Sequence, residues 1–338
     1  MQIIPSIDVT YTHTEGAPLC IVQSGITYPH GSDIHQKRRF LEENYDWLRR
    51  ALMNEPRGHR NTYGVFLTPP SSPDADAGTI WMCSGGFMHG CGHGTIAAAM
   101  AIVAARPAID IPEYTTLRFE TTAGLVTAEV HARDSRVQWC RFEHVPAFVV
   151  DRKVRVDLGH WGRFNVDIVF AGNFFGLVEW DNPEVALSAD NGKYIRELAV
   201  ALRAKLREQV PVQHPEYADI ATIDVIGFHG KASRPDADYR VAYMWGDGQL
   251  SRGPGGTGSS AMVALYEDQG RLKLGDTLTS EGLLASGIFE AKLTSETRIG
   301  KYRAVVPTVK GRAFLIGSAK WLFDPEDPLR EGFTIAEV

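Results

Sequence analysis

The residues best suited to chemistry form the turn Cys91-Gly92-His93-Gly94-Thr95, which runs directly into the apolar stretch Ile96-Ala97-Ala98-Ala99-Met100-Ala101. An alanine-rich apolar stretch of this kind predicts a buried helix. The first amides of a helix have no internal partner, so they can hold an anionic group, and the helix dipole there favours a thiolate over a thiol. We therefore expect a reactive thiolate, Cys91, beside an anion-binding site.

A second glycine-rich turn with the same design occurs much later in the chain. It reads Gly253-Pro254-Gly255-Gly256-Thr257-Gly258-Ser259-Ser260 and leads into the small apolar residues Ala261-Met262-Val263-Ala264. Both turns place glycine and threonine before a helix of small residues. We expect the two turns to form two halves of one site.

The composition limits the class of protein. With 338 residues, 44% hydrophobic and 22% charged, the chain predicts a globular protein of two domains, each with its own core. The net charge of −6 argues against an extended nucleic-acid surface, which needs clustered Lys and Arg. No run of about 18 apolar residues occurs, and Met1 to Asp8 do not resemble a secretion signal, so we expect a cytoplasmic protein that does not bind membranes. The four cysteines fit no zinc or disulfide pattern, and we expect them to be mostly reduced and buried; they are Cys20, Cys83, Cys91 and Cys140.

Several elements that position the two turns can be expected from periodicity. A helix is predicted from Asp33, a capping residue, to Met53, with Pro56 ending it. A second amphipathic helix is predicted from the apolar stripe Ile195, Leu198, Leu202 and Leu206. Short strands are predicted before and after the turns, among them 80–83, 164–170, 174–178, 223–229, 239–245, 305–309 and 313–317, with a hairpin around 123–124.

At this point the residues resemble a known family. The segment Met88-His89-Gly90-Cys91-Gly92-His93-Gly94-Thr95 looks like the first catalytic motif of the proline racemase superfamily, which includes proline racemase, 4-hydroxyproline 2-epimerase and trans-3-hydroxy-L-proline dehydratase. The resemblance extends over nearly the whole chain. Other matching stretches are His13-Thr14-Glu15-Gly16, Glu55-Pro56-Arg57-Gly58-His59, Asp167 with Gly172-Asn173-Phe174, Val306-Pro307-Thr308-Val309-Lys310-Gly311, and Asp327-Pro328 with Gly332-Phe333.

The resemblance implies a fold and a kind of ligand. The fold is α/β (α+β) of the diaminopimelate epimerase type, with two pseudo-symmetric domains that each wrap a curved sheet around a central helix. We expect residues 1–158 with 318–338 to form the first domain, which carries Cys91, and residues 159–317 to form the second, which carries Gly255. The implied ligand is a proline-type imino acid, and the family works without metal or other cofactor. We also expect a homodimer.

The second turn departs from the family pattern. Racemases and epimerases of the family read Asp-Arg-Ser-Pro-Cys-Gly-Thr-Gly-Thr at this turn, whereas this chain reads Ser251-Arg252-Gly253-Pro254-Gly255-Gly256-Thr257-Gly258-Ser259. Gly255 thus replaces the second cysteine and Ser251 the aspartate. Inversion at a carbon needs an acid or base on each face, and glycine can be neither. We therefore expect a one-base reaction, the dehydration of trans-3-hydroxy-L-proline, with a racemase or 4-hydroxyproline 2-epimerase using water or another second base as the alternative.

The site residues follow from the motifs and the resemblance. Cys91 is expected to remove the α-proton. The remaining candidates are expected to bind substrate: Gly92, His93, Gly256 and Thr257 around the carboxylate, with Ser251 near the amine and His229 as a further donor.

Three other interpretations stay open. His89, Cys91 and His93 alternate and could face one side as metal ligands, although no fourth ligand is evident. The second turn resembles a phosphate loop but lacks its lysine. A protein that has lost its second base could also bind proline-like acids without turning them over.

Overall fold

The computed structural model describes residues 5–27 and 29–335, and the chain divides into two compact units. The first unit consists of residues 1–89, 94–140 and 312–338, and the second of residues 90–93 and 141–311. The sequence predicts boundaries near 158 and 317, whereas the contacts place them near 140 and 311. The four residues 90–93 around Cys91 belong to the second unit, together with the second glycine turn.

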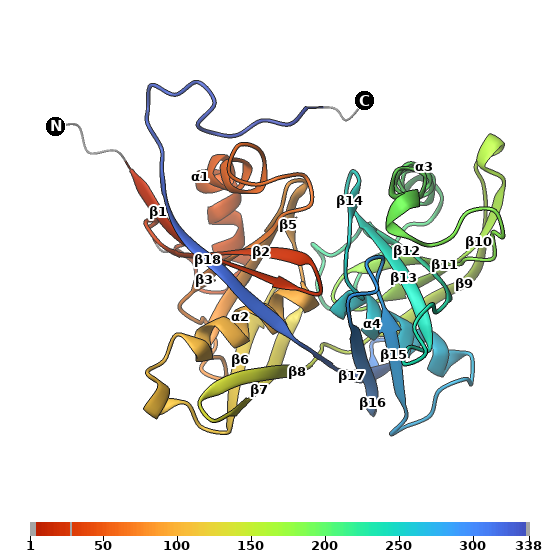
Figure 1. The fold of residues 1–338 in the computed structure, drawn as a ribbon. Helices are drawn as coiled ribbons and strands as arrows, with labels where there is room; N and C mark the ends of the chain where they lie inside the picture. The colour runs from red at the N-terminus through yellow and green to blue at the C-terminus, as the bar shows by residue number, and fades with distance from the viewer. Residues whose placement is uncertain (1–4, 28, 336–338) are drawn as a thin grey trace. The chain divides into compact units, whose positions relative to one another are not determined.

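The first unit is built on a mixed sheet that joins the two ends of the chain. Its strand order is β18-β1-β2-β3-β4-β6-β7, with β5 as a hairpin partner of β4. Neighbouring strands are antiparallel except for β2–β3 and β4–β6. In Figure 1, β18 in blue lies along β1 in red. The strands are β1 (Ser6–Thr14), β2 (Ala17–Ser24), β3 (Tyr63–Thr68), β4 (Ala77–Cys83), β5 (Gly86–Met88), β6 (Tyr114–Thr121), β7 (Gly124–Arg133) and β18 (Ala313–Leu322).

The second unit repeats this topology. Its strand order is β9-β10-β11-β12-β13-β15-β16-β17, with β14 as the hairpin partner of β13, and the parallel pairs are β11–β12 and β13–β15. The internal repetition suspected from the two turns therefore extends over the whole fold. Its strands are β9 (Phe148–Asp157), β10 (Arg163–Phe170), β11 (Phe174–Glu179), β12 (Ile223–Lys231), β13 (Tyr239–Trp245), β14 (Gln249–Leu250), β15 (Thr277–Glu281), β16 (Ile288–Ile299) and β17 (Tyr302–Gly311), and β8 (Arg136–Glu143) passes from one unit to the other.

Two long amphipathic helices occupy equivalent places in the two units. The helix α1 (Ile34–Met53) begins where Asp33 accepts a hydrogen bond from the Gln36 amide at 2.8 Å, and it ends at Asn54. The helix α3 (Gly192–Gln209) buries the predicted stripe of Ile195, Leu198, Leu202 and Leu206. Both helices confirm the predictions made from the spacing of apolar residues in the sequence.

Two shorter helices follow the glycine turns and are buried nearly throughout. They are α2 (Gly92–Ala104) and α4 (Gly256–Asp268). Neither carries a charged residue in its first turn, so nothing on the helix itself competes with a bound anion there. Single 3₁₀ turns occur at Ala108–Asp110, Gly159–Trp161 and Ala189–Asn191.

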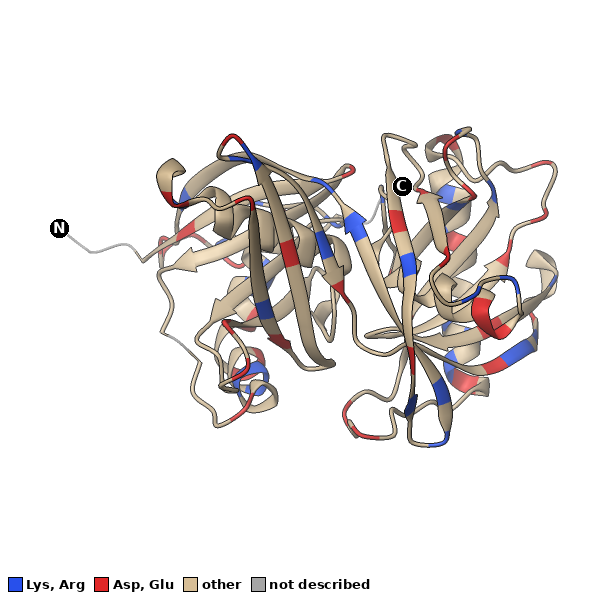
Figure 2. Ribbon diagram, turned by 90° about the horizontal axis from the view of Figure 1, so that it is seen from below, with Lys and Arg blue, Asp and Glu red and all other residues tan. Residues whose placement is uncertain are grey.

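The surface carries both signs of charge. Figure 2 shows Lys and Arg interspersed with Asp and Glu on each of the two units. No helix among the described residues is long and apolar enough to cross a membrane. All four cysteines are buried and free of disulfides, as expected. Of the first residues, which we read as lacking a secretion signal, Met1 to Ile4 lie outside the described part.

Candidate functional site

The two glycine turns of the sequence meet in the structure, through backbone contact between Gly92 and Gly256. A Cβ atom placed on Gly92 would lie 2.5 Å from the Cα of Gly256 and 2.5 Å from the amide nitrogen of Thr257. A Cβ placed on Gly256 would likewise lie 2.7 Å from the Cα of Gly92. Only glycine allows two backbones to approach this closely. The first residues of α2 and α4 therefore lie side by side.

Paired helix starts can bind an anion. The first amides of each helix have no partner within the helix, and the N-cap of α4 is Gly255, which makes no side-chain hydrogen bond to them. Thr257 is the second residue of α4 and is only partly buried. The arrangement concentrates amide donors and the positive ends of two helix dipoles at one place, as a carboxylate requires.

Cys91 lies directly before this pair of helix starts and is 5% exposed. Its Sγ is 3.6 Å from Nδ1 and 3.8 Å from Nε2 of His93. Burial lowers the pKa of His93 to about 4, so the imidazole is neutral at pH 7. A neutral imidazole can exchange a hydrogen bond with the sulfur but supplies no full positive charge, so stabilisation of a thiolate falls mainly to the helix starts.

The buried side-chain amide of Asn173 holds Gly90, the residue before Cys91, in place. Asn173 Nδ2 donates a hydrogen bond of 3.0 Å to the carbonyl oxygen of Gly90, and Asn173 is 1% exposed. Asn173 follows Gly172 in the turn between β10 and β11. The sequence marked Gly172-Asn173 as a break between strands and as part of the family pattern, but it gave no sign that this turn contacts the loop of Cys91.

Two of the predicted binding residues, Ser251 and His229, lie outside the paired starts of α2 and α4. The Ser251 hydroxyl donates to the carbonyl oxygen of Gly253 at 3.2 Å, within its own turn. The ring of His229, on β12, lies 6.4 Å from the ring of Tyr266. Tyr266 is ten residues after Gly256 in α4, about 15 Å along the helix. The structure therefore places His229 near the opposite end of α4 from the paired helix starts.

The structure also shows what lies beside Gly255. Its φ is +73°, and a Cβ placed there would lie 2.7 Å from Cδ2 of Tyr243. The sequence contained Tyr243 only as one residue of a predicted strand. No periodicity or motif indicated this contact, because it joins β13 to a turn across the core of the unit.

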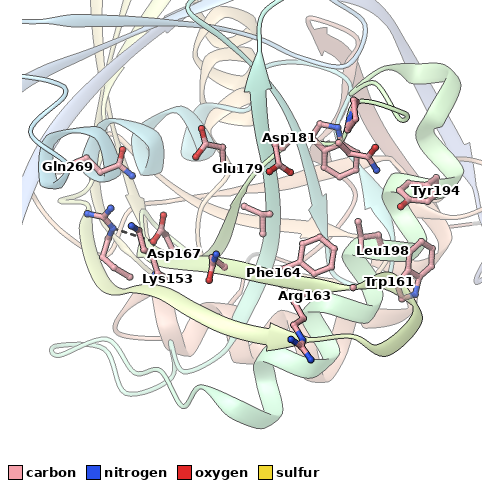
Figure 3. A pocket seen from close by; sticks show the side chains of 17 residues that line it. Lys153, Trp161, Arg163, Phe164, Asp167, Glu179, Asp181, Tyr194, Leu198 and Gln269 are labelled. Atoms are coloured by element: carbon pink, nitrogen blue, oxygen red, sulfur yellow. Dashed lines mark hydrogen bonds and ion pairs between the residues drawn. The ribbon is translucent and has the colours of Figure 1, made fainter.

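A hollow of about 650 Å³ lies elsewhere on the second unit (Figure 3). Aromatic and charged side chains line it, among them Trp161, Phe164, Tyr194 and Arg163. None of the predicted site residues is among its lining residues. It is a feature separate from the paired helix starts.

The alternative of a metal site gains no support from the geometry. His89 contacts Arg38 and Thr122 in the first unit, with Nδ1 at 2.8 Å from an Arg38 nitrogen and 3.0 Å from the Thr122 hydroxyl. In the described ranges, no group of three or more His, Cys, Asp or Glu side chains is arranged to hold a metal ion.

Comparison with known proteins agrees with the resemblance of the motifs. The family model described as proline racemase matches residues 9–334. A 4-hydroxyproline 2-epimerase of Cereibacter sphaeroides is 48% identical over 99% of this chain and 100% of its own length. A proline racemase of Clostridioides difficile is 36% identical, with coverage of 99% and 100%.

Solved structures support the same fold. A hydroxyproline epimerase from Agrobacterium vitis, with bound trans-4-hydroxy-L-proline, superposes with a TM-score of 0.92 at 26% identity, covering 99% of this chain and 96% of that one. A protein of the PhzF family from Bacillus anthracis shares the fold with a TM-score of 0.59 at 16% identity. The predicted fold, with two epimerase-like domains of the same topology, is confirmed.

The prediction of a trans-3-hydroxy-L-proline dehydratase is wrong. The chain is 48% identical to a 4-hydroxyproline 2-epimerase, but 32% identical to the trans-L-3-hydroxyproline dehydratase of Xenopus tropicalis. The structural match to a hydroxyproline epimerase points the same way. We had inferred dehydration from a missing second base, and that inference fails because the group that protonates the second face need not be the side chain of residue 255. The chain is an enzyme of the proline racemase family.

Proposed function

We propose that this protein is a 4-hydroxyproline 2-epimerase, which inverts the configuration at the α-carbon of 4-hydroxyproline. The proposal rests on the similarity to 4-hydroxyproline 2-epimerases over the full chain and on the meeting of two helix starts beside one cysteine. The contact of Gly92 with Gly256 carries most weight, because it brings the first amides of two helices together directly after Cys91, where they could hold an anion. A cyclic imino acid presents both a carboxylate and an acidic α-hydrogen to such a site.

Each group has a defined part in the proposed reaction. The amides at the starts of α2 and α4, including those of Gly92, His93, Gly256 and Thr257, hold the substrate carboxylate. The same amides stabilise the charge that develops when the α-proton leaves. Cys91, as thiolate, takes the proton from one face. A proton delivered to the opposite face yields the epimer.

The reaction can be followed in D2O with trans-4-hydroxy-L-proline as substrate. We expect NMR to show the 2-epimer carrying deuterium at the α-carbon. L-proline and trans-3-hydroxy-L-proline, supplied separately, test the range of substrates. If trans-4-hydroxy-L-proline yields neither epimer nor α-deuterium, the proposal fails.

The role of Cys91 is tested by substitution. Cys91→Ala and Cys91→Ser should lower kcat by about a thousandfold or more while the protein stays folded, because both remove the base and leave the backbone unchanged. Cys140→Ala is the matched control, since Cys140 is also a buried free cysteine but lies on β8. It should keep turnover within about threefold of the parent. Turnover retained by Cys91→Ala would contradict the assignment.

A further inference from the structure

The position opposite Cys91 in the family pattern is occupied here by Gly255 in a left-handed conformation. Its φ of +73° is one that residues with a side chain rarely adopt. The conformation is held in place because the Gly255 carbonyl oxygen accepts hydrogen bonds from the Ser259 amide at 2.9 Å and from the Ser259 hydroxyl at 2.8 Å. The glycine is therefore part of an ordered turn.

The space beside this glycine contains the ring of Tyr243. A Cβ placed on Gly255 would lie 2.7 Å from Cδ2 and 2.9 Å from Cε2 of that ring. A Cβ on Gly258 would lie 2.2 Å from its Cζ, and one on Gly227 would lie 2.6 Å from its Cε1. Real Cβ atoms essentially never come this close to another heavy atom. Three glycines, one on β12 and two at the start of α4, thus leave room for one aromatic ring.

The ring itself is firmly held. Tyr243 is 5% exposed, its partner across the β12–β13 pair is Gly227, and Phe175 meets it edge to face with ring centroids 5.9 Å apart. Its hydroxyl makes no hydrogen bond within the described part of the chain. Burial, with a smaller contribution from Tyr239 and Tyr266, raises the pKa of Tyr243 well above its usual value. The phenol therefore stays neutral near pH 7, where it is a weaker acid than an exposed tyrosine and has no phenolate to act as a base.

We propose that Tyr243 and Gly255 form a size-matched pair in place of the second catalytic side chain: the ring fills the space of that side chain, and solvent water that approaches past the partly exposed Gly255 exchanges the proton on the second face. The inference rests on the proposed epimerase function for its chemical part. Its structural part stands alone, because it concerns only which atoms occupy the space next to residue 255. Tyr243 is in this view a positioning residue for the start of α4.

The proton balance closes without a further reactant. The Cys91 thiolate takes the α-proton and becomes a thiol. Water then gives a proton to the opposite face of the carbanion and leaves hydroxide. Once the epimer has left the site, the hydroxide takes the proton of the Cys91 thiol, which restores both the thiolate and the water. No oxidant, reductant or cofactor takes part in these steps.

The packing is tested by comparing two glycines with the same backbone strain. Gly255 has φ +73° with Tyr243 beside it, whereas Gly270 has φ +71° with no atom within 4 Å of an added Cβ. Gly255→Ala should therefore lower the urea unfolding midpoint by about twice as much as Gly270→Ala, or more. In a Tyr243→Ala background, which opens the space, the two substitutions should have equal effects. Equal effects in the parent background would overturn the proposed pair.

The chemistry is tested by removing the hydroxyl alone. Tyr243→Phe keeps the ring and should keep the parent's unfolding midpoint, because the hydroxyl has no hydrogen bond to lose in the described structure. It should also still form the epimer with deuterium at the α-carbon in D2O. A folded Tyr243→Phe protein that no longer epimerises would make the phenol the proton donor and overturn the role of water.

The two tests separate failure of the inference from failure of the proposed function. If the parent protein does not act on 4-hydroxyproline, the midpoints of the Gly255 and Gly270 variants still decide whether the pair exists. If the parent protein does act on 4-hydroxyproline but Gly255→Ala and Gly270→Ala lower the unfolding midpoint equally, the proposed function is supported and the proposed pair of Tyr243 and Gly255 is contradicted.

Discussion

At the scale of single residues, the site depends on how the neighbours of Cys91 hold it in place. His93 contributes a neutral imidazole 3.6 Å from the sulfur, since burial lowers its pKa to about 4. Asn173 holds the carbonyl oxygen of Gly90 and so fixes the peptide that leads into Cys91. A thiol that must meet one hydrogen of a bound ligand loses rate quickly when it is misplaced.

Asn173 therefore offers a test at this scale. Asn173→Ala removes a buried donor and leaves the Gly90 carbonyl without it, so we expect kcat to fall about 10- to 100-fold with a smaller change in KM. Asn44→Ala is the matched control, because Asn44 Nδ2 also donates to a backbone carbonyl, that of Phe40 at 2.8 Å, but on the exposed face of α1. Equal kinetics in the two variants would contradict a positioning role for Asn173.

At the scale of elements, the proposed active site is a meeting of two helix starts. Both helices are apolar and buried nearly throughout, so their first turns are fixed by the core around them. The close approach depends on glycine at the point of contact, where even a methyl group would meet backbone atoms of the other helix start. Backbone atoms cannot rotate away from an added methyl group as a flexible side chain can.

Gly92→Ala tests this contact. The added methyl would lie 2.5 Å from backbone atoms of Gly256 and Thr257, so we expect the helix starts to separate, turnover to fall at least about a hundredfold, and the free energy of unfolding to drop by about 2 kcal/mol or more. Gly317→Ala on β18 is the control, since nothing lies within 4 Å of its added methyl. We expect its unfolding free energy to change by less than about 0.5 kcal/mol. A fully active Gly92→Ala enzyme would refute the contact.

At the scale of the whole molecule, the second unit buries several histidines in the neutral form. Burial lowers the pKa of His93 and His229 to about 4 and that of His144 to about 3. In the unfolded chain a histidine titrates near 6.5. Between these values the unfolded state binds more protons than the folded state, so stability is greatest above pH 6.5 and is lost as the pH falls toward 4.

The expected loss is large enough to measure by urea unfolding. Each such histidine should cost about 2 kcal/mol of unfolding free energy at pH 5 relative to pH 8. His144→Gln should reduce this pH dependence by about one histidine's share. A parent protein equally stable at pH 5 and pH 8 would contradict neutral burial of these rings.

The sequence alone determined the local structure and the family. The apolar periodicity of α1 and α3, the capping by Asp33 and the glycine turns before α2 and α4 are properties of neighbouring residues, so they could be recognised without a structure. The cysteine motif and its companions likewise indicated the proline racemase family, which the family model confirms.

Only the tertiary structure decided how distant residues combine. Asn173 meets Gly90 across 83 positions of sequence, Tyr243 fills the space at Gly255, and His229 lies beside Tyr266 far along α4 from the paired helix starts. The wrong prediction of dehydration has the same origin, since it treated a missing side chain at one position as a missing function of the whole site. The sequence gives the type of each side chain. Which side chains come into contact depends on how strands and helices pack, and packing brings together residues that no local sequence pattern connects.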